Sequence, residues 1–337
     1  MTPELVAAVE AQSDFAAEVF DRLRAASVDV RGVTRASYGE GEQAAHALMA
    51  EIAGGLGLEI TQDAAANTYM TWPGRDRSKP IKMVGSHLDS VPQGGNFDGA
   101  AGVVSGLTAI RALQALGHAP AQDIAVMGVR AEESCWFGVS YIGSRSALGV
   151  LPDGALEDAR RMDDGVALAE HMAKCGGDPD RVREGPPHLD VARIAAFLEP
   201  HIEQGPVLVE EGFPAGIVTG IRGNRRFPNA RCYGEYAHCG GAPRRVRQDA
   251  VVAATEFVQA MDRLWDKAEA AGEDFACTIG KFQTDPERHA MTVISGEVAF
   301  TLDMRSVDPD VLRRLEARVP EIAAEIGARS DVRFELG

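Results

Sequence analysis

The sequence predicts an α/β fold in two domains. The chain has 337 residues, which corresponds to two domains at roughly 150 residues per domain. Hydrophobic residues make up 45% of the chain and charged residues 25%, so the chain can bury a globular core. In its first part, helical patterns alternate with short apolar runs of strand length, which predicts a sheet with helices on both faces.

The first domain is expected to begin with a helix over residues 3–27, where apolar residues recur at helical spacing. A second helix over about 40–55 is expected to end at the pair Gly54-Gly55, a typical stop signal. The further elements expected here are, in order, a strand over 81–89, a helix over 99–116, a strand over 123–134, a peripheral polar excursion with one helix over 153–190, and a strand over 193–205.

The pattern changes after Gly212, where we expect a second domain. The elements expected there are, in order, a long β-type run over 215–236, a helix over 247–270, strands over 276–283 and 296–306, a helix over 308–328 and a short strand over 331–336. This βαββαβ order predicts a ferredoxin-like layer. We therefore expect domains at residues 1–212 and 213–337.

Charge and composition exclude several classes of protein. The net charge of −16 argues against a general nucleic-acid binder, which would carry a basic face. The N-terminal sequence MTPELVAAVEAQ has no basic segment followed by an apolar one, so we expect no secretory signal. No apolar run reaches the length of a membrane span. The five cysteines are odd in number and form no CxxC pair, which fits a reducing cytoplasm rather than a disulfide framework.

The strongest local motif is GSHLDSVPQGGNFDGAAGV, which contains His87, Asp89 and Asp98. His87 and Asp89 are two residues apart at a strand end, so their side chains point the same way. We expect His87 and Asp98 to bind a metal ion, and Asp89 to orient the imidazole of His87 from behind. The alternative is a solvated loop whose His and Asp only cap the following helix.

Two more groups follow the ends of expected strands. Glu132 and Glu133 are adjacent carboxylates, and one can bind metal while the other takes a proton from water. An ordinary acidic turn is the alternative. His201 lies in the motif HIEQG, and alone it would favour a structural role. Because sites form where parallel strands end, these residues together predict a centre for one or two divalent ions.

Four motifs in this order resemble the hydantoinase/carbamoylase amidases: GSHLDSVPQGGNFDGAAGV, the acidic pair before W-F-G, HIEQGPVLVEEG and YGEYAHCGGAPRRVRQDA. The resemblance runs from about Gly32 to Arg305. That family includes N-carbamoyl-L-amino acid hydrolases, allantoate and ureidoglycolate amidohydrolases and β-ureidopropionases, within the aminoacylase-like dinuclear metallopeptidases. The resemblance implies a metallopeptidase-type catalytic domain with a helix-covered mixed sheet at 1–212, and an inserted lid and dimerisation domain at 213–337.

The resemblance also implies residue roles in the catalytic domain. His87 and His201 would bind one metal ion, Asp98 would bridge to a second ion, Glu133 would bind the second ion, and Glu132 would be the general base. Two ions per subunit are expected, with Zn²⁺, Mn²⁺ or Co²⁺ as candidates.

The second domain would supply groups that contact the substrate. His238 matches the family's transition-state histidine and would reach the carbonyl oxygen in the partner subunit's site of a homodimer. Arg305 would hold the substrate carboxylate. Gln204, His289 and Thr292 are further substrate-binding candidates.

This sequence departs from the family pattern at several positions. Trp136 replaces an arginine, and Thr292 replaces an asparagine, for which nearby His289 is a candidate substitute. Arg244 and Arg245 enter a region that is normally uncharged; either they favour a more acidic substrate, or they pair with the excess carboxylates of this chain. Family members also continue to a final His ligand of the second metal, so the sequence indicates either a piece of a longer enzyme or an incomplete second metal site.

The predicted function is metal-dependent hydrolysis of the C–N bond of an N-carbamoyl (ureido) acid, with release of ammonia and carbon dioxide. Two alternatives stay open at this point. One is a dipeptidase or aminoacylase of the same superfamily, and the other is a non-catalytic or truncated relative that lacks the last His ligand. The expected partners are a small ureido acid and a second copy of the chain, with no nucleic acid and no membrane.

Overall fold

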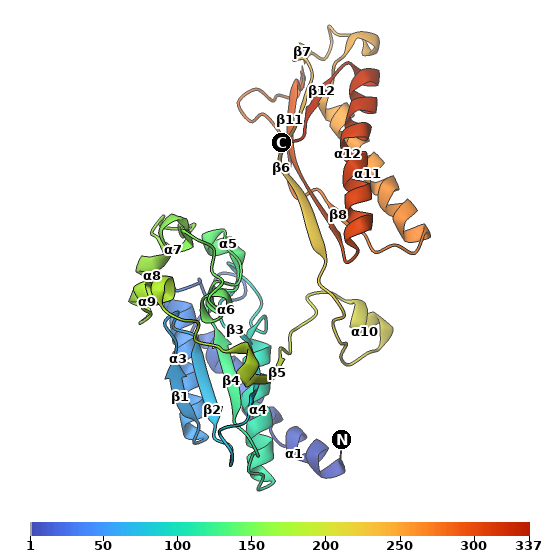
Figure 1. Ribbon diagram of the computed structural model, residues 1–337. Coiled ribbons are helices and arrows are strands. Elements are labelled where there is room, and N and C mark those ends of the chain that lie inside the picture. Colours follow the sequence, from blue (N-terminus) through green and yellow to red (C-terminus); the bar gives the residue numbers. More distant parts are fainter. Residues whose placement is uncertain (1) are drawn as a thin grey trace. The chain divides into compact units, whose positions relative to one another are not determined.

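A computed structural model describes residues 2–337 and divides the chain into two compact units, Met1–Phe213 and Pro214–Gly337 (Figure 1). Each unit has its own sheet and its own hydrophobic core. The α/β class expected from the sequence is confirmed.

The first unit is built on one mixed five-stranded sheet. Its strands lie in the order β1 (Glu59–Gln62), β2 (Thr68–Trp72), β4 (Ile124–Val129), β3 (Ile81–His87) and β5 (Ile194–Leu198). β3 runs parallel to β4 and β5, whereas β2 is antiparallel to β1 and β4. The carboxyl ends of β3, β4 and β5 therefore meet at one edge of the sheet, which is where open α/β sheets form their sites.

Four helices precede or follow these strands: α1 (Pro3–Glu10), α2 (Ser13–Ala25), α3 (Glu40–Gly55) and α4 (Ala100–Ala115). The expected single helix over 3–27 is wrong, because the chain leaves helical geometry at Gln12. There the Gln12 side chain donates to the carbonyl of Ala8, and the hydroxyl of Ser13 donates to the carbonyl of Glu10. Such local bonds compete with a continuous helix.

The two faces of this sheet are covered differently. Val19, Leu23, Met49 and Leu107 of the helices form one core cluster with Met70 and Val126 of the strands. On the other face, Tyr69, Met83 and Met127 cluster with Ala147 of α6 (Ile142–Ala147) and pack against Leu189. The expected helical cover on both faces is thus only partly correct, since one short helix and a loop cover the second face.

A peripheral segment packs around its own small core, with Trp136, Phe137, Leu156, Leu168 and Met172 buried together. Its other helices are α5 (Ser134–Phe137), α7 (Ala155–Asp158), α8 (Leu168–Lys174) and α9 (Pro179–Glu184). The expectation of one helix over 153–190 is wrong, because the segment contains three short ones. Gly154 before α7, Gly165 between α7 and α8, and Gly176 after α8 adopt positive φ angles, so the backbone turns between these short helices. A 3₁₀ turn, Val191–Arg193, then leads into β5.

The second unit packs two long helices on an antiparallel sheet. Its strands lie in the order β12 (Arg333–Glu335), β6 (Gly223–Tyr233), β11 (Glu297–Ser306) and β8 (Ala276–Thr278), and β9 (Phe282–Thr284) also pairs with β11. The helices are α11 (Ala250–Ala270) and α12 (Pro309–Ser330). Phe257, Phe300, Leu315 and Val319 are among the buried residues between these layers.

One expected strand of this unit is interrupted. The run over 276–283 forms β8 and β9, which pair with different parts of β11. The register of β11 against β6 shifts between Phe300 and Leu302, and Thr301 exchanges hydrogen bonds with Lys281 at this point. The bulge therefore separates the two short strands.

Three small elements complete the description: α10 (Val207–Glu211), the two-stranded ladder of β7 (Ala237–His238) and β10 (Val293–Ile294), and a 3₁₀ turn, Arg244–Val246. Among residues 2–337, no helix combines the length and the apolar character that crossing a membrane requires. The five cysteines are free thiols.

Candidate metal centre

His87 is the last residue of β3 and is buried at the carboxyl edge of the first sheet. Its Nδ1 atom lies 3.0 Å from the backbone carbonyl oxygen of Asp89 and 3.3 Å from Oδ1 of the same residue. Its Nε2 atom faces Oδ1 of Asp98 at 3.7 Å and a carboxylate oxygen of Glu132 at 4.0 Å. With Nδ1 turned to the oxygens of Asp89, Nε2 is the ring nitrogen that faces the other carboxylates, as in a metal-ligating histidine.

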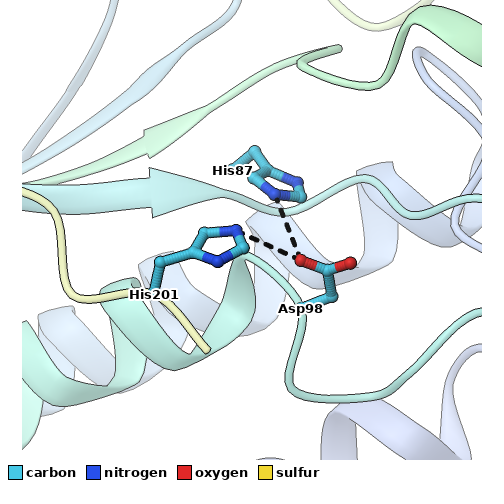
Figure 2. A group of neighbouring side chains, drawn as sticks. All are labelled: His87, Asp98 and His201. Carbon is cyan, nitrogen blue, oxygen red and sulfur yellow. Dashed lines mark ion pairs between the residues drawn. The ribbon is translucent and has the colours of Figure 1, made fainter. Parts of the chain in front are cut away.

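Asp98 and His201 complete one group of ligand atoms with His87 (Figure 2). Nε2 of His201 lies 3.2 Å from Oδ1 of Asp98, and the three ligand atoms lie within 4.8 Å of one another. His201 follows β5 and Asp98 precedes α4, so the group joins two segments about a hundred residues apart. A second group, with atoms equally close, consists of His87, Glu132 and Glu133.

The backbone and a neighbouring amide fix Asp98 in this group. Nε2 of Gln204 donates to Oδ2 of Asp98 at 2.6 Å, so only Oδ1 faces the histidines. Gly99 has a φ of +65°, and a Cβ there would lie 2.5 Å from the ring of His87. A side chain at position 99 would therefore clash with both the imidazole and the backbone carbonyl of His87.

Asp89 connects the end of β3 to the acidic pair. Its two carboxylate oxygens accept hydrogen bonds from the backbone N–H of Glu132, at 3.0 Å, and of Glu133, at 3.1 Å. The hydroxyl of Ser37 donates to the same carboxylate at 2.6 Å, and the Asp89 side chain is fully buried. Asp89 thus holds both the imidazole of His87 and the turn that carries the glutamates.

Burial and neighbouring charges shift the pKa values of the ionisable groups in this site. Burial opposes protonation of His87, but Asp89, Glu132 and Asp98 outweigh it and raise the pKa of the imidazole to about 9. Burial, together with the charge of Glu132, raises the pKa of Glu133 to about 7. Burial also raises the pKa of Glu132, whereas the nearby imidazole of His201 lowers the pKa of Asp98. Perturbed values in one cluster are typical of functional sites.

A divalent cation fits these residues. Oδ1 of Asp98 is buried and has no hydrogen-bond donor in good geometry among the residues that the structure describes, although it lies between two imidazoles. A cation between these atoms would satisfy the oxygen and both nitrogens, and it would reduce the repulsion among the four carboxylates nearby. Imidazole and carboxylate donors of this kind suit Zn²⁺ and similar ions.

In the second unit, His238 lies in β7 with an exposed side chain. The backbone N–H of Gly240 donates to its Nδ1 atom at 3.1 Å, so the neutral imidazole carries its proton on Nε2. Arg247 holds the loop around it, with Nε on the carbonyl of Ala242 and Nη2 on the carbonyl of Cys239, both at 2.7 Å. His238 is thereby presented as a hydrogen-bond donor.

The other expected substrate contacts also lie in this unit. Arg305, on the sheet face away from the helices, donates to both carboxylate oxygens of Asp303 at 3.0 and 3.2 Å. His289 is exposed, 3.2 Å from the hydroxyl of Thr284, and lines a cavity of about 490 Å³ with Cys239. The backbone carbonyl of Thr292 accepts from the N–H of Cys239 at 2.9 Å, next to His238.

The sequence did not point to Arg35, which supports the metal centre from inside. Its guanidinium is fully buried and donates to the carbonyls of Leu88, at 2.8 Å, and of Asp98, at 3.5 Å. One side chain thus holds the backbone carbonyl of Leu88, next to His87, and that of Asp98 itself. Trp136, whose role the sequence left open, is buried and donates from its indole nitrogen to the carbonyl of Ser90 at 2.7 Å, which is a structural contact.

Comparisons with known proteins agree on one family. Residues 67–151 match Peptidase family M28. An N-carbamoyl-L-amino acid amidohydrolase of Geobacillus stearothermophilus is 34% identical over 303 residues, which cover 90% of this chain and 71% of that protein. Its counterpart in Paenarthrobacter aurescens is 32% identical over 327 residues, which cover 96% of this chain and 77% of that protein.

A solved structure gives the same result. The amidase of the hydantoinase/carbamoylase family from Burkholderia multivorans matches with a TM-score of 0.85 at 28% identity, over 96% of this chain and 76% of that one. The names of these relatives do not favour a dipeptidase or an aminoacylase. The chain therefore belongs to the hydantoinase/carbamoylase family of amidases, as an amidohydrolase that acts on C–N bonds other than peptide bonds.

Proposed function

We propose that this chain hydrolyses an N-carbamoyl (ureido) acid to ammonia, carbon dioxide and the free amine, using the residues of the candidate metal centre. The observation that carries the proposal is the pair of ligand groups that share His87, with the carboxylate of Glu132 in one of them. A metal centre with an adjacent carboxylate is an arrangement that can hydrolyse an unactivated C–N bond.

His87, Asp98 and His201 would hold one divalent ion, and Glu133 together with Asp98 would help to hold a second. When bound, such ions supply Lewis acidity, which polarises a carbonyl group and lowers the pKa of water at the site. The nitrogen and oxygen donors suit Zn²⁺, Mn²⁺ or Co²⁺. Asp89 acts by orientation, because it holds the imidazole of His87 and both N–H groups of the acidic pair.

Glu132 would move the protons. Its carboxylate takes a proton from the attacking water while the water oxygen bonds to the carbamoyl carbon. It then returns the proton to the terminal nitrogen as the C–N bond breaks and ammonia leaves. The remaining carbamic acid moves its hydroxyl proton to the nitrogen and loses carbon dioxide, which frees the amine. A raised pKa in a partly buried carboxylate suits a group that must accept and then donate a proton.

Two groups of the second unit would act on the substrate itself. The Nε2–H of His238 would donate to the carbonyl oxygen as negative charge develops there. Arg305 would bind the substrate carboxylate through the same paired hydrogen bonds that it makes to Asp303. We place His238 in the partner subunit's site of a homodimer, with Gln204, His289 and Thr292 as further contacts, and we place the enzyme in the cytoplasm.

The products of the reaction test this proposal. The purified chain, treated with a chelator and reloaded with Mn²⁺, Zn²⁺ or Co²⁺, is given a panel of ureido acids, N-acetyl amino acids and dipeptides. We expect ammonia and the free amine in equal amounts from at least one ureido acid. Release of an amino acid from a dipeptide or an N-acetyl compound, with no ammonia from any ureido acid, would contradict the proposal.

A further inference from the structure

The arginines of the second unit fall into two groups. Most form an ion pair, as in Arg222–Asp274, Arg225–Glu316 and Arg231–Glu297. Within the described residues 214–337, the arginines without a carboxylate oxygen within 4.0 Å are Arg244, Arg245, Arg247, Arg263 and Arg288. Acidic partners are plentiful in a chain with a net charge of −16, so arginines without one are notable.

Three of these arginines belong to the segment that carries His238. The carbonyl of His238 accepts from the N–H groups of Gly241, at 3.0 Å, and Ala242, at 3.2 Å, so the chain turns back on itself. The 3₁₀ turn Arg244–Val246 follows at once. Arg247 uses its guanidinium on the carbonyls of this loop, whereas Arg244 and Arg245 are exposed and their side chains form no hydrogen bond with any described residue.

Cys239 and Arg247 of this segment line the cavity of about 490 Å³ together with His289 and Ser295, whereas Arg244 and Arg245 lie outside its lining. The carboxylate of Asp249 also lines the cavity, but it accepts hydrogen bonds from the first N–H groups of α11. Oδ1 of Asp249 therefore caps the helix, and the charged groups of the His238 loop itself are the three arginines.

We propose that Arg244 and Arg245 bind a second carboxylate of the substrate, so that the preferred substrate is the N-carbamoyl derivative of a dicarboxylic amino acid. The proposal rests on the proposed function, because it needs His238 at the reacting carbonyl. Within the second unit, neither arginine pairs with a carboxylate of the protein, which leaves both guanidinium groups free for a substrate. A guanidinium matches a carboxylate with two parallel hydrogen bonds, which a neutral side chain of the substrate cannot form.

The test compares two substrates of nearly equal shape, N-carbamoyl-L-aspartate and N-carbamoyl-L-asparagine, with the metal-loaded full chain. The quantity measured is the ratio of their kcat/KM values for ammonia release. We expect a ratio of about ten or more in the wild type and a fall of about tenfold in the double variant Arg244→Gln/Arg245→Gln. The matched control is Arg263→Gln, an exposed and unpaired arginine on α11, which should leave the ratio unchanged.

Each other outcome contradicts a specific statement. Ammonia from both substrates with a ratio near one, or a ratio that the double variant does not change, would overturn the inference while the proposed function stands. A double variant with an unchanged ratio but a changed oligomeric state would assign the arginines to a subunit contact. No ammonia from any ureido acid would overturn the proposed function, and the inference with it.

Discussion

Nε2 of His201 lies 3.2 Å from Oδ1 of Asp98. Asp98 precedes and His201 follows the peripheral helical segment that connects β4 to β5. The same oxygen faces His87, and no described residue offers it a hydrogen bond in good geometry. One carboxylate oxygen between two imidazoles is the central feature of this molecule, because every proposed step depends on what these three side chains hold.

Replacing Asp98 tests this feature directly. In Asp98→Asn, an amide replaces the bridging charge, so we expect loss of at least one metal ion per chain and a fall in activity of more than about a hundredfold. Metal content by mass spectrometry, with circular dichroism to show that the fold persists, checks this. Asp29→Asn, which alters an exposed loop carboxylate, is the control. Full metal content in Asp98→Asn would remove Asp98 from the ligand set.

Removing the carboxylate of Asp89 should affect both stability and activity. Three donors, from Ser37, Glu132 and Glu133, end on this buried group, and removing it leaves them unsatisfied. We expect Asp89→Ala to lower the free energy of unfolding by about 3 kcal/mol. Urea unfolding of the metal-free protein measures the change. A cost below about 1 kcal/mol would mean that Asp89 does not hold the acidic pair in place.

The metal-free protein should lose stability as the pH rises. The pKa of His87 is raised from 6.5 to about 9 in the folded chain, so the native state binds this proton more tightly than the unfolded state. The stabilisation is complete below pH 6.5 and is lost as the pH rises through 9, by about 3 kcal/mol. Urea unfolding of chelator-treated protein at pH 6.5 and pH 9 measures this change, and His87→Gln should leave only the smaller loss that comes from Glu133, whose pKa is raised to about 7. An equal free energy of unfolding of the wild type at the two pH values would contradict a raised pKa of His87.

Arg247 should act on turnover through His238. Because its guanidinium holds the carbonyls of Cys239 and Ala242, Arg247→Gln should loosen the loop and lower kcat by about tenfold, with metal content unchanged. Arg247→Lys, which keeps a donor, should restore part of the rate. The ¹⁵N spectrum of the wild type should show His238 protonated on Nε2, and this signature should weaken in Arg247→Gln. A wild-type imidazole protonated on Nδ1 would contradict the account.

The sequence predicted the parts of this molecule that depend on local pattern. His87, Asp98 and Glu133 follow or flank apolar runs, and the rule that sites form at the carboxyl ends of parallel strands places them together. The antiparallel hairpin of β1 and β2 was missed, because β1 is exposed along its whole length and shows no apolar alternation. That these residues bind metal stays a prediction.

What the sequence did not show depends on contacts between distant segments. Gln204 reaches Asp98 from a backbone in the left-handed region, with a φ of 60°, and no residue type signals that conformation for a glutamine. Ser37 meets Asp89 across 52 residues. The absence of acidic partners around Arg244 and Arg245 likewise depends on where the other carboxylates of the second unit lie, which only the fold determines.

The most direct test of the account is the rate of ammonia release by Glu132→Gln, measured beside the wild type with the same ureido acid and the same metal load. We expect a loss of more than about a hundredfold in kcat with metal content unchanged, because in the proposed function Glu132 moves protons whereas Glu133 binds the ion. The matched variant Glu133→Gln should instead lose metal. A Glu132→Gln enzyme that keeps its metal and its rate would contradict the account.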